Sequence, residues 1–573
     1  MFHRRPFLSP NLPGFLAWSL ASLSTWILCP ACSQRQPYDK IIRNGTVYDG
    51  KGGAPYKADI AINADTIAAI GDLSKATAKE EVDALGKAVA PGFINMLSWA
   101  NESLIQDGRS QSDIRQGVTL EVMGEGSSMG PLNADMKARQ EGGEGDIHYK
   151  IEWNTLGEYL DYMEKRGISC NIASFVGAGT IRTNVLGEDD RAPSPAELAR
   201  MQELVRQAMR EGAMGVGSSL IYAPDFFAKT DELVALCKVA SAYGGSYISH
   251  IRSEGNKINA ALAELITIAK EANIHAEVYH LKLAGKDNWH KLDSVISQIG
   301  TARNSGLDIT ADMYTYLAGA TGMTSAFPPS LQDGGFGKLW ERLHDPLIRS
   351  KMAKAMNTNA AGWENLYYGS GSPDKVLLLG FKRDSLKRYT GKTLAEVAKI
   401  RGKTPEETAM DLIVRDSSRV DVAYFMMDEE NVKKEIRLPW VSFGSDEGSY
   451  APEGVFLKSN PHPRAYGNFI RVLGKYARDE KALPLQEAIR KLSWLPATNL
   501  KLQKRGCLLK GNYADIVVFD PAAVQDHATF DKPAQYATGI SDVFVNGVQV
   551  LKAGIHTNAT PGRFIKGPGY SKK

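Results

Sequence analysis

Two short runs decide the fold of this chain: YISHIRSEG at 247–255 and AEVYHLKLAG at 276–285, joined by a segment rich in helix-forming residues. A strand, a helix and a second strand form a βαβ unit, whose right-handed crossover makes the two strands parallel neighbours. His250 and His280 close the two strands, so we expect both at the same end of one sheet, where they can face a common ion. In a barrel of such units, catalytic side chains lie at this end of the strands.

A basic residue follows each histidine by two positions, Arg252 after His250 and Lys282 after His280. Because side chains alternate along a strand, we expect each base on the same strand face as its imidazole, within reach of a substrate. A single histidine at a strand end is more often a structural residue. The pairing instead favours a shared metal or substrate site.

The chain length and the numbers of charged residues restrict the possible architecture and partners. A chain of 573 residues exceeds one small core, which predicts a large barrel with appended modules. Lys and Arg number 68 and Asp and Glu number 65, giving a net charge of +3. No global field would recruit nucleic acid or an anionic membrane, so we expect neither as a partner.

Apolar and polar residues alternate in both ends of the chain, 36–90 and 501–573, and Asn-Gly pairs mark turns between the runs. We expect the two ends to build one small β module together. Residues 91–500 instead alternate apolar runs with amphipathic segments, which predicts an α/β fold, a (β/α)8 TIM-like barrel. Residues 328–385 break this pattern and predict an insertion at the barrel mouth, either a lid or pocket wall or a plain surface excursion.

The first 35 residues differ in composition from the rest. A basic start precedes the apolar run LPGFLAWSLASLSTWIL at 12–28, which is typical of a secretory signal. Ala31 before Cys32 resembles a bacterial lipobox, so we expect export to the bacterial cell envelope, with the protein either periplasmic or lipid-anchored through Cys32. Ordinary signal-peptidase cleavage and a retained membrane anchor are the alternatives, since the run is near the minimum spanning length.

Many ordered motifs resemble the amidohydrolase superfamily, and within it the N-acyl-D-amino-acid deacylases, over nearly all of the chain after the leader. They include QGVTLEVMGEG, SHIRSEG, HLKLAG, ADMYTYLAG, FGSDEG, HPRAYG and GNYADIVVFDP. The resemblance implies a TIM-like barrel carrying zinc, with a small β-sandwich formed by both chain ends. The alternation of the chain ends had suggested that module independently.

The resemblance also implies roles for single residues. His250 and His280 are similar to the two histidines that hold the tightly bound zinc. Asp446 in FGSDEG is similar to the aspartate that takes the proton of the attacking water, and Arg464 in HPRAYG to the arginine that binds the substrate carboxylate. Lys282 and Tyr314 are similar to residues that line that pocket, and Arg252 is expected beside them.

The chain departs from the family pattern at two places. The family reads PGFID-x-H-x-H where this chain has Leu97 and Trp99 in place of both histidines, so the first metal position is expected to be empty. Gly126 aligns with the family's cysteine ligand, and Glu125 precedes it. A carboxylate suits zinc, so a one-residue shift of this glycine-rich loop would let Glu125 replace the thiolate. One zinc ion is therefore expected.

The leading hypothesis is a zinc-dependent amidohydrolase that removes the acyl group from small N-acyl amino acids, of D configuration. One alternative is hydrolysis of a cyclic amide, as by hydantoinases and dihydroorotases, or of a dipeptide. Another is a metal-free envelope binding protein that lost catalysis together with H-x-H. Acyl chain length, side-chain preference and oligomeric state are left open by the sequence.

Overall fold

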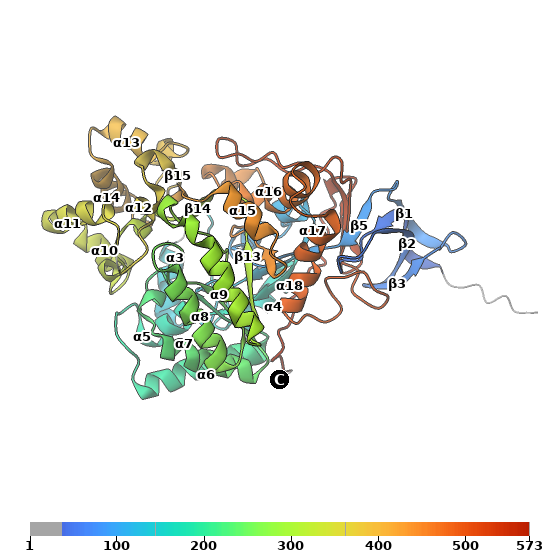
Figure 1. Cartoon of the computed structure of the whole chain (residues 1–573), viewed down its shortest axis with the longest axis horizontal. Coiled ribbons are helices and arrows are strands. Elements are labelled where there is room, and N and C mark those ends of the chain that lie inside the picture. Colours follow the sequence, from blue (N-terminus) through green and yellow to red (C-terminus); the bar gives the residue numbers. More distant parts are fainter. Residues whose placement is uncertain (1–36, 144, 361, 572–573) are drawn as a thin grey trace, which may run out of the picture. The chain divides into compact units, whose positions relative to one another are not determined.

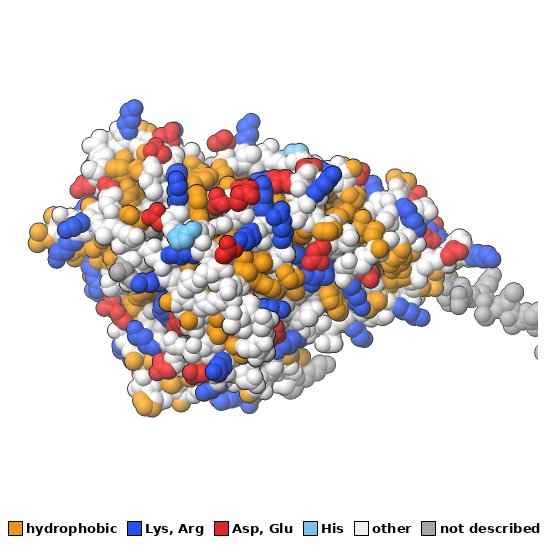
Figure 2. All heavy atoms as spheres, viewed as in Figure 1, with side chains coloured by type: hydrophobic (Ala, Val, Ile, Leu, Met, Phe, Trp, Pro, Cys, Tyr) orange, Lys and Arg blue, Asp and Glu red, His pale blue; other side chains and the backbone are white. Residues whose placement is uncertain are grey.

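The computed structural model describes residues 37–143, 145–360 and 362–571 (Figure 1). The predicted leader, 1–35 with Cys32, lies outside the described residues. Among the described helices, none is long and apolar enough to cross a membrane. On the face in view in Figure 2, basic and acidic side chains are interspersed, in keeping with the small net charge.

Parallel strands form a closed ring at the centre of the described chain. Two parallel sheets make it, in the orders β6-β7-β8 and β17-β13-β12-β11-β10-β9. Only Phe175 separates β8 from β9, and Met96 N–H donates to the Phe443 carbonyl at 3.2 Å, which joins β6 to β17. Counting β8 and β9 as one position gives eight positions in the described ring, so the predicted (β/α)8 barrel is confirmed.

The strands of the ring are short and almost wholly buried, as parallel strands covered on both faces must be. They are β6 (Phe93–Asn95), β7 (Val118–Met123), β8 (Asn171–Ser174), β9 (Val176–Gly177), β10 (Gly215–Ser219), β11 (Ser246–His250), β12 (His275–Val278), β13 (Ile309–Met313) and β17 (Val441–Phe443).

Amphipathic helices pack around the ring. They include α4 (Leu156–Arg166), α5 (Ala178–Leu186), α6 (Pro195–Glu211), α7 (Thr230–Ala242), α8 (Ile258–Ala272), α9 (Leu292–Asn304), α15 (Glu429–Ile436), α16 (Arg464–Arg471), α17 (Leu485–Leu492) and α18 (Trp494–Asn499). The start of α6 follows from its sequence, because Ser194 and Glu197 form a capping box and Pro195 fits the first helical position.

Both chain ends contribute to a single nine-stranded sheet, in the order β21-β20-β19-β18-β5-β1-β2-β3, with β4 paired to β1. Its strands are β1 (Tyr38–Val47), β2 (Tyr56–Asn63), β3 (Thr66–Gly71), β4 (Ala78–Asp83), β5 (Ala88–Pro91), β18 (Ile516–Phe519), β19 (Ile540–Val545), β20 (Val548–Lys552) and β21 (Ile555–His556). The antiparallel pair β5–β18 is the seam between the ends, with Ile516 opposite Pro91. Ile60, Ile62 and Val89 share one core with Ile516 and Phe544.

A long excursion separates β13 from β17. It carries an antiparallel sheet in the order β14-β16-β15, namely β14 (Ala318–Gly322), β15 (Val376–Gly380) and β16 (Asp421–Phe425). Its helices include α10 (Phe336–Arg342), α11 (Pro346–Met356), α12 (Leu366–Ser370), α13 (Leu394–Arg401) and α14 (Pro405–Asp416). The insertion predicted at 328–385 lies inside this larger unit, which has its own core and lies far from β1 to β3 (Figure 1).

Candidate metal centre

Three buried side chains meet at the carboxyl ends of β7, β11 and β12. Glu125 follows β7, His250 ends β11, and His280 follows β12. The Oε1 atom of Glu125 lies 3.1 Å from His250 Nδ1 and 3.0 Å from His280 Nε2. One ligand atom from each residue fits within a span of 4.8 Å. Two imidazoles and a carboxylate are the donors of a catalytic zinc site, with a fourth position left for water or substrate.

Two glycines let Glu125 turn towards the histidines. Gly124 and Gly126 have φ values of 109° and 66°, which side chains rarely adopt. A Cβ at Gly124 would lie 2.3 Å from the Phe175 carbonyl oxygen, and one at Gly126 would lie 2.4 Å from the side chain of Ser219. The loop therefore brings the carboxylate of Glu125 to the two histidines.

Glu254 holds the imidazole of His280 from its other side. Its Oε1 lies 3.0 Å from His280 Nδ1 and accepts a 2.5 Å bond from Lys282 Nζ. An outer carboxylate on a ligand histidine fixes the tautomer and orients the ring. His280 has a φ of 36°, held by a 2.9 Å bond from its N–H to Asp312 Oδ1. Glu254 was not anticipated from the sequence, because nothing in a loop fixes where such a carboxylate points.

The charges around the cluster favour a cation. Burial and the neighbouring Lys282 oppose protonation of His280, but Glu254 and Glu125 outweigh them and raise its pKa to about 10. Burial likewise opposes ionisation of Glu125, yet His280 and His250 hold the pKa of its carboxyl below its usual range. Two buried carboxylates thus stabilise positive charge between the imidazoles. The residues present fit a divalent ion.

Asp446 and Arg464 form the next part of the site. Arg464 is only 1% exposed, and its Nη2 forms an ion pair with Asp446 Oδ2 at 2.9 Å and donates to the Asp446 carbonyl at 2.6 Å. The guanidinium carbon lies 4.3 Å from the centre of the Tyr314 ring. Within the described chain, Arg464 Nε and Nη1 have no hydrogen-bond partner. A buried cation with free N–H groups is a ready receptor for a carboxylate.

The carboxyl of Asp446 suits proton transfer. Burial raises its pKa above the ordinary value, against the lowering effect of Arg464, and the negative charge of Glu125 adds to the rise. Its backbone has a φ of 52°, a conformation that costs free energy and is found at functional sites. This carboxyl therefore combines an unusual backbone, an arginine partner and a place beside the metal cluster.

Trp99 joins the two carboxylates of the centre. Its indole Nε1–H donates to Glu125 Oε2 and to Asp446 Oδ1, each at 3.1 Å. From the sequence, Trp99 is expected to wall the space left by the missing ligand and to make the pocket more apolar, and its two hydrogen bonds are not anticipated. The other substituted position, Leu97, is fully buried in the core.

The expectation for Arg252 needs correction. Its Nε and Nη2 bind Glu264 on α8 at 2.8 and 2.9 Å, and its Nη1 and Nη2 donate to the carbonyls of Phe226 and Ala228. The strand β11 ends at His250, so alternation along a strand no longer governs Arg252. Its guanidinium therefore anchors α8 and a neighbouring loop. Lys282, in contrast, does lie at the centre, where it donates to Glu254 and to the His280 carbonyl.

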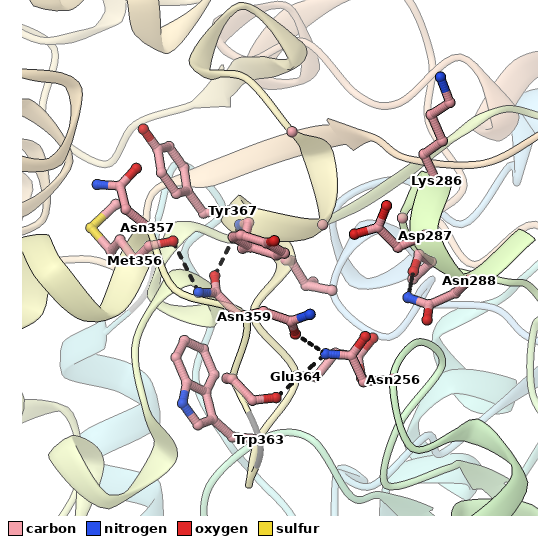
Figure 3. A pocket seen from close by; sticks show the side chains of 18 of the residues that line it. Asn256, Lys286, Asp287, Asn288, Met356, Asn357, Asn359, Trp363, Glu364 and Tyr367 are labelled. Atoms are coloured by element: carbon pink, nitrogen blue, oxygen red, sulfur yellow. Dashed lines mark hydrogen bonds between the residues drawn. The ribbon is translucent and has the colours of Figure 1, made fainter.

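A cavity of about 320 Å³ lies between the excursion and the loops that follow β11 and β12 (Figure 3). Amide side chains of Asn256 and Asn359 meet across it, and Ser253 Oγ donates to Glu364 Oε2 at 2.6 Å. Burial raises the pKa of Glu364 to about 7, and the charge of Glu254 adds to this effect, against the hydrogen bond from Ser253. The excursion is thereby fastened to the same loops that carry the metal cluster.

Comparison with known proteins identifies the family. Residues 80–551 match the description "Amidohydrolase family". The chain belongs to this family. D-aminoacylase from Alcaligenes xylosoxydans xylosoxydans is 33% identical over 539 residues, covering 93% of this chain and 98% of its own. The predicted family and the predicted hydrolase class of this amidohydrolase are confirmed.

Two solved structures resemble this amidohydrolase over most of its length. One is a D-aminoacylase with a TM-score of 0.76 at 30% identity, covering 92% of this chain and 100% of its own. Its description names a binuclear metal centre, with activation by one metal and attenuation by a second. N-acyl-D-glutamate deacylase from Bordetella bronchiseptica, complexed with zinc and a phosphonate inhibitor, has a TM-score of 0.76 at 27% identity, covering 93% and 100%.

Proposed function

We propose that this amidohydrolase removes the acyl group from small N-acyl-D-amino acids with the help of one zinc ion. The observation that carries the proposal is the buried guanidinium of Arg464, whose Nε and Nη1 lack a partner in the described chain, next to Asp446 and the metal cluster. A free carboxylate is the common feature of N-acyl amino acids. The D-aminoacylase and N-acyl-D-glutamate deacylase relatives support the linear amide and the D configuration.

The substrate carboxylate would bind Arg464 through an N–H group that has no partner in the described chain, as a charge-assisted hydrogen bond. The Tyr314 ring supports the guanidinium from one face and holds it in place. The amide would then extend towards the cluster of Glu125, His250 and His280. Binding of the carboxylate therefore sets which bond of the substrate faces the reacting groups.

Glu125, His250 and His280 would hold the zinc ion. When bound, such an ion supplies a Lewis acid that makes water a nucleophile near neutral pH and polarises an amide carbonyl. Asp446 accepts the proton of the attacking water at a carboxylate oxygen and returns it to the leaving amine. The raised pKa of Asp446 suits this double role, because the carboxyl must both gain and release a proton.

The test is an assay of the metal-loaded protein against matched N-acyl-D- and N-acyl-L-amino acids, with release of the free amine measured. We expect turnover of D substrates. His280→Ala should lose both metal and activity, whereas Asp446→Asn should lose activity and keep the metal. No amine release from protein that carries one zinc would refute the proposal. Purification without stoichiometric zinc, with binding of an acylated amino acid, would instead identify a binding protein.

We also propose that the protein is exported and anchored by lipid on Cys32, in the leader that precedes the described residues. The lipobox-like Ala31-Cys32 pair supports this proposal. Metabolic labelling with a palmitate analogue should mark the wild-type protein, and Cys32→Ala should abolish the label. Labelling that persists in Cys32→Ala would exclude this anchor.

A further inference from the structure

The Trp99 indole lies on the side of Glu125 that faces away from the histidines. Its N–H binds Glu125 Oε2, whereas the opposite oxygen, Oε1, lies beside both imidazoles. The same N–H also binds Asp446 Oδ1. One donor therefore ties a candidate metal ligand to the candidate proton acceptor.

The backbone fixes the position of this indole. The backbone N–H of Trp99 donates to the Glu447 carbonyl at 2.9 Å, and the backbone N–H of Asp446 donates to the Leu97 carbonyl at 2.8 Å. Leu97 is fully buried, and a Cβ at Gly444 would lie 2.8 Å from it, so the two segments are in tight contact. Trp99 is 38% exposed, so part of the residue faces solvent.

A cation shared by Glu125 Oε2 and Asp446 Oδ1 would need the space that the indole N–H now fills. The indole nitrogen is a donor without an available lone pair, so it cannot bind a metal. Leu97 offers no ligand atom either. We propose that the Trp99 indole closes the centre to a second ion and positions Asp446 beside a single metal site, in the place of a bridging cation. Only the positioning of Asp446 for catalysis rests on the proposed function.

Metal titration tests the closure without substrate. Metal-free protein is titrated with zinc and with cobalt, and bound metal is measured after dialysis. We expect one equivalent in the wild-type protein. Trp99→Phe keeps the ring and loses the donor, so it should still bind one equivalent, but about 10–100-fold more weakly, since Glu125 loses the partner that orients it. The visible spectrum of the cobalt form should shift in the same variant.

Trp340→Phe is the matched control, because Trp340 is also partly exposed and its indole N–H also serves as a donor, to the Val414 carbonyl in the excursion. It should leave affinity and spectrum unchanged. Two equivalents of similar affinity in the wild-type protein would overturn the closure. If Trp99→Phe has the metal affinity and the cobalt spectrum of the wild-type protein, Trp99 does not orient Glu125. The titration of the wild-type protein alone tests whether the centre excludes a second ion, so this test does not depend on how well a variant folds. Thermal unfolding would detect a variant that folds poorly.

Steady-state kinetics test the positioning of Asp446. We expect Trp99→Phe to lower kcat by about 10-fold or more with little change in KM, because the substrate carboxylate binds at Arg464 and not at the indole. An unchanged kcat would overturn the positioning. If no N-acyl amino acid is turned over by any form, the proposed function fails, while the metal titration still decides whether Trp99 limits the centre to one ion.

Discussion

At the scale of single residues, Glu125 would give the proposed metal centre a negative ligand that is hard and weakly polarisable. It lies between two glycines with positive φ, so the loop is shaped for this side chain to point inward. A carboxylate binds zinc through oxygen and, unlike a thiolate, is not oxidised. The centre is therefore expected to tolerate oxidising conditions.

We predict that Glu125→Gln weakens zinc binding by more than the roughly 10–100-fold that loss of an outer partner costs, because the neutral amide is a poor ligand. Zinc content after dialysis against a chelator measures the effect. Glu341→Gln, at an exposed glutamate of α10, is the control and should retain the metal. Retention of one zinc at wild-type affinity in Glu125→Gln would mean that another group is the third ligand.

A second prediction concerns Glu364, whose pKa is raised to about 7. Between pH about 4 and 7 the folded state holds this proton while the unfolded chain has lost it. The contribution of Glu364 to stability is thus present at low pH and lost as pH rises through 7. Glu364→Gln removes this loss, so its Tm relative to wild type should be higher at pH 8 than at pH 5.

Thermal unfolding at the two pH values measures the difference. The exposed Glu152→Gln is the control, and its Tm difference from wild type should be the same at both values. A Glu364→Gln variant whose relative Tm does not depend on pH would show that this carboxyl titrates normally in the folded protein.

The histidines could be found from sequence because each closes an apolar run, and a parallel sheet brings such ends together. The proposed role of Glu125 followed from its place beside the missing cysteine. The partners Glu254 and Trp99 could not be found, because loop geometry and ring orientation decide where their polar atoms point. Arg252 was misplaced for a related reason: the chain leaves the strand at His250, and alternation stops there.

At the scale of elements, a buried ion pair joins two helices of the barrel wall. Arg182 on α5 donates from Nη1 to both carboxylate oxygens of Glu232 on α7, at 2.9 and 2.7 Å, and their side chains are 1% and 5% exposed. Such pairs cost desolvation and are strongly felt when only one partner is removed.

We predict that Arg182→Met destabilises the fold by about 3–5 kcal/mol, because it leaves the Glu232 carboxylate buried without its partner. Arg182→Met with Glu232→Gln should recover much of the loss. Urea unfolding of the single and double variants measures the coupling. Lys338→Met, in an exposed pair on α10, should leave the urea midpoint unchanged. A double variant no more stable than Arg182→Met would contradict the prediction.

The strands and helices of the barrel could largely be predicted, because apolar runs alternate with amphipathic segments. The length of the excursion was underestimated. Its sheet pairs β14 with β16, and these two strands lie about a hundred residues apart in the chain. Pairing over that separation leaves no periodic signal between the strands. From the sequence alone, the helices α13 and α14 cannot be distinguished from further barrel helices, because no local signal shows that they belong to the excursion.

At the scale of the whole molecule, residues 562–565 hold the barrel wall in place. Ile172 on β8 donates its N–H to the Arg563 carbonyl at 3.0 Å and accepts from Ile565 N–H at 2.8 Å. A Cβ on Gly562 would lie 1.9 Å from the Cys170 carbonyl oxygen. The C-terminal segment thus lies directly against the strand, with no room for a side chain at Gly562.

We predict that Gly562→Val lowers the Tm and destabilises the protein by about 1–3 kcal/mol, because the segment must move away from β8. Gly53→Val is the control, since nothing lies within 4 Å of a Cβ there. Thermal unfolding compares both with wild type. Equal Tm values for the two variants would show that the segment moves without loss of stability.

The seam between β5 and β18 determines when folding can finish. Residues 88–91 leave the ribosome long before residues 516–519 are synthesised, so the edge of β5 that pairs with β18 stays unpaired while the barrel residues are translated. Contacts between residues so distant in sequence form slowly, and an open strand edge invites pairing with other chains. We therefore expect refolding to be slow and to depend on protein concentration, with aggregation most severe before β18 pairs with β5.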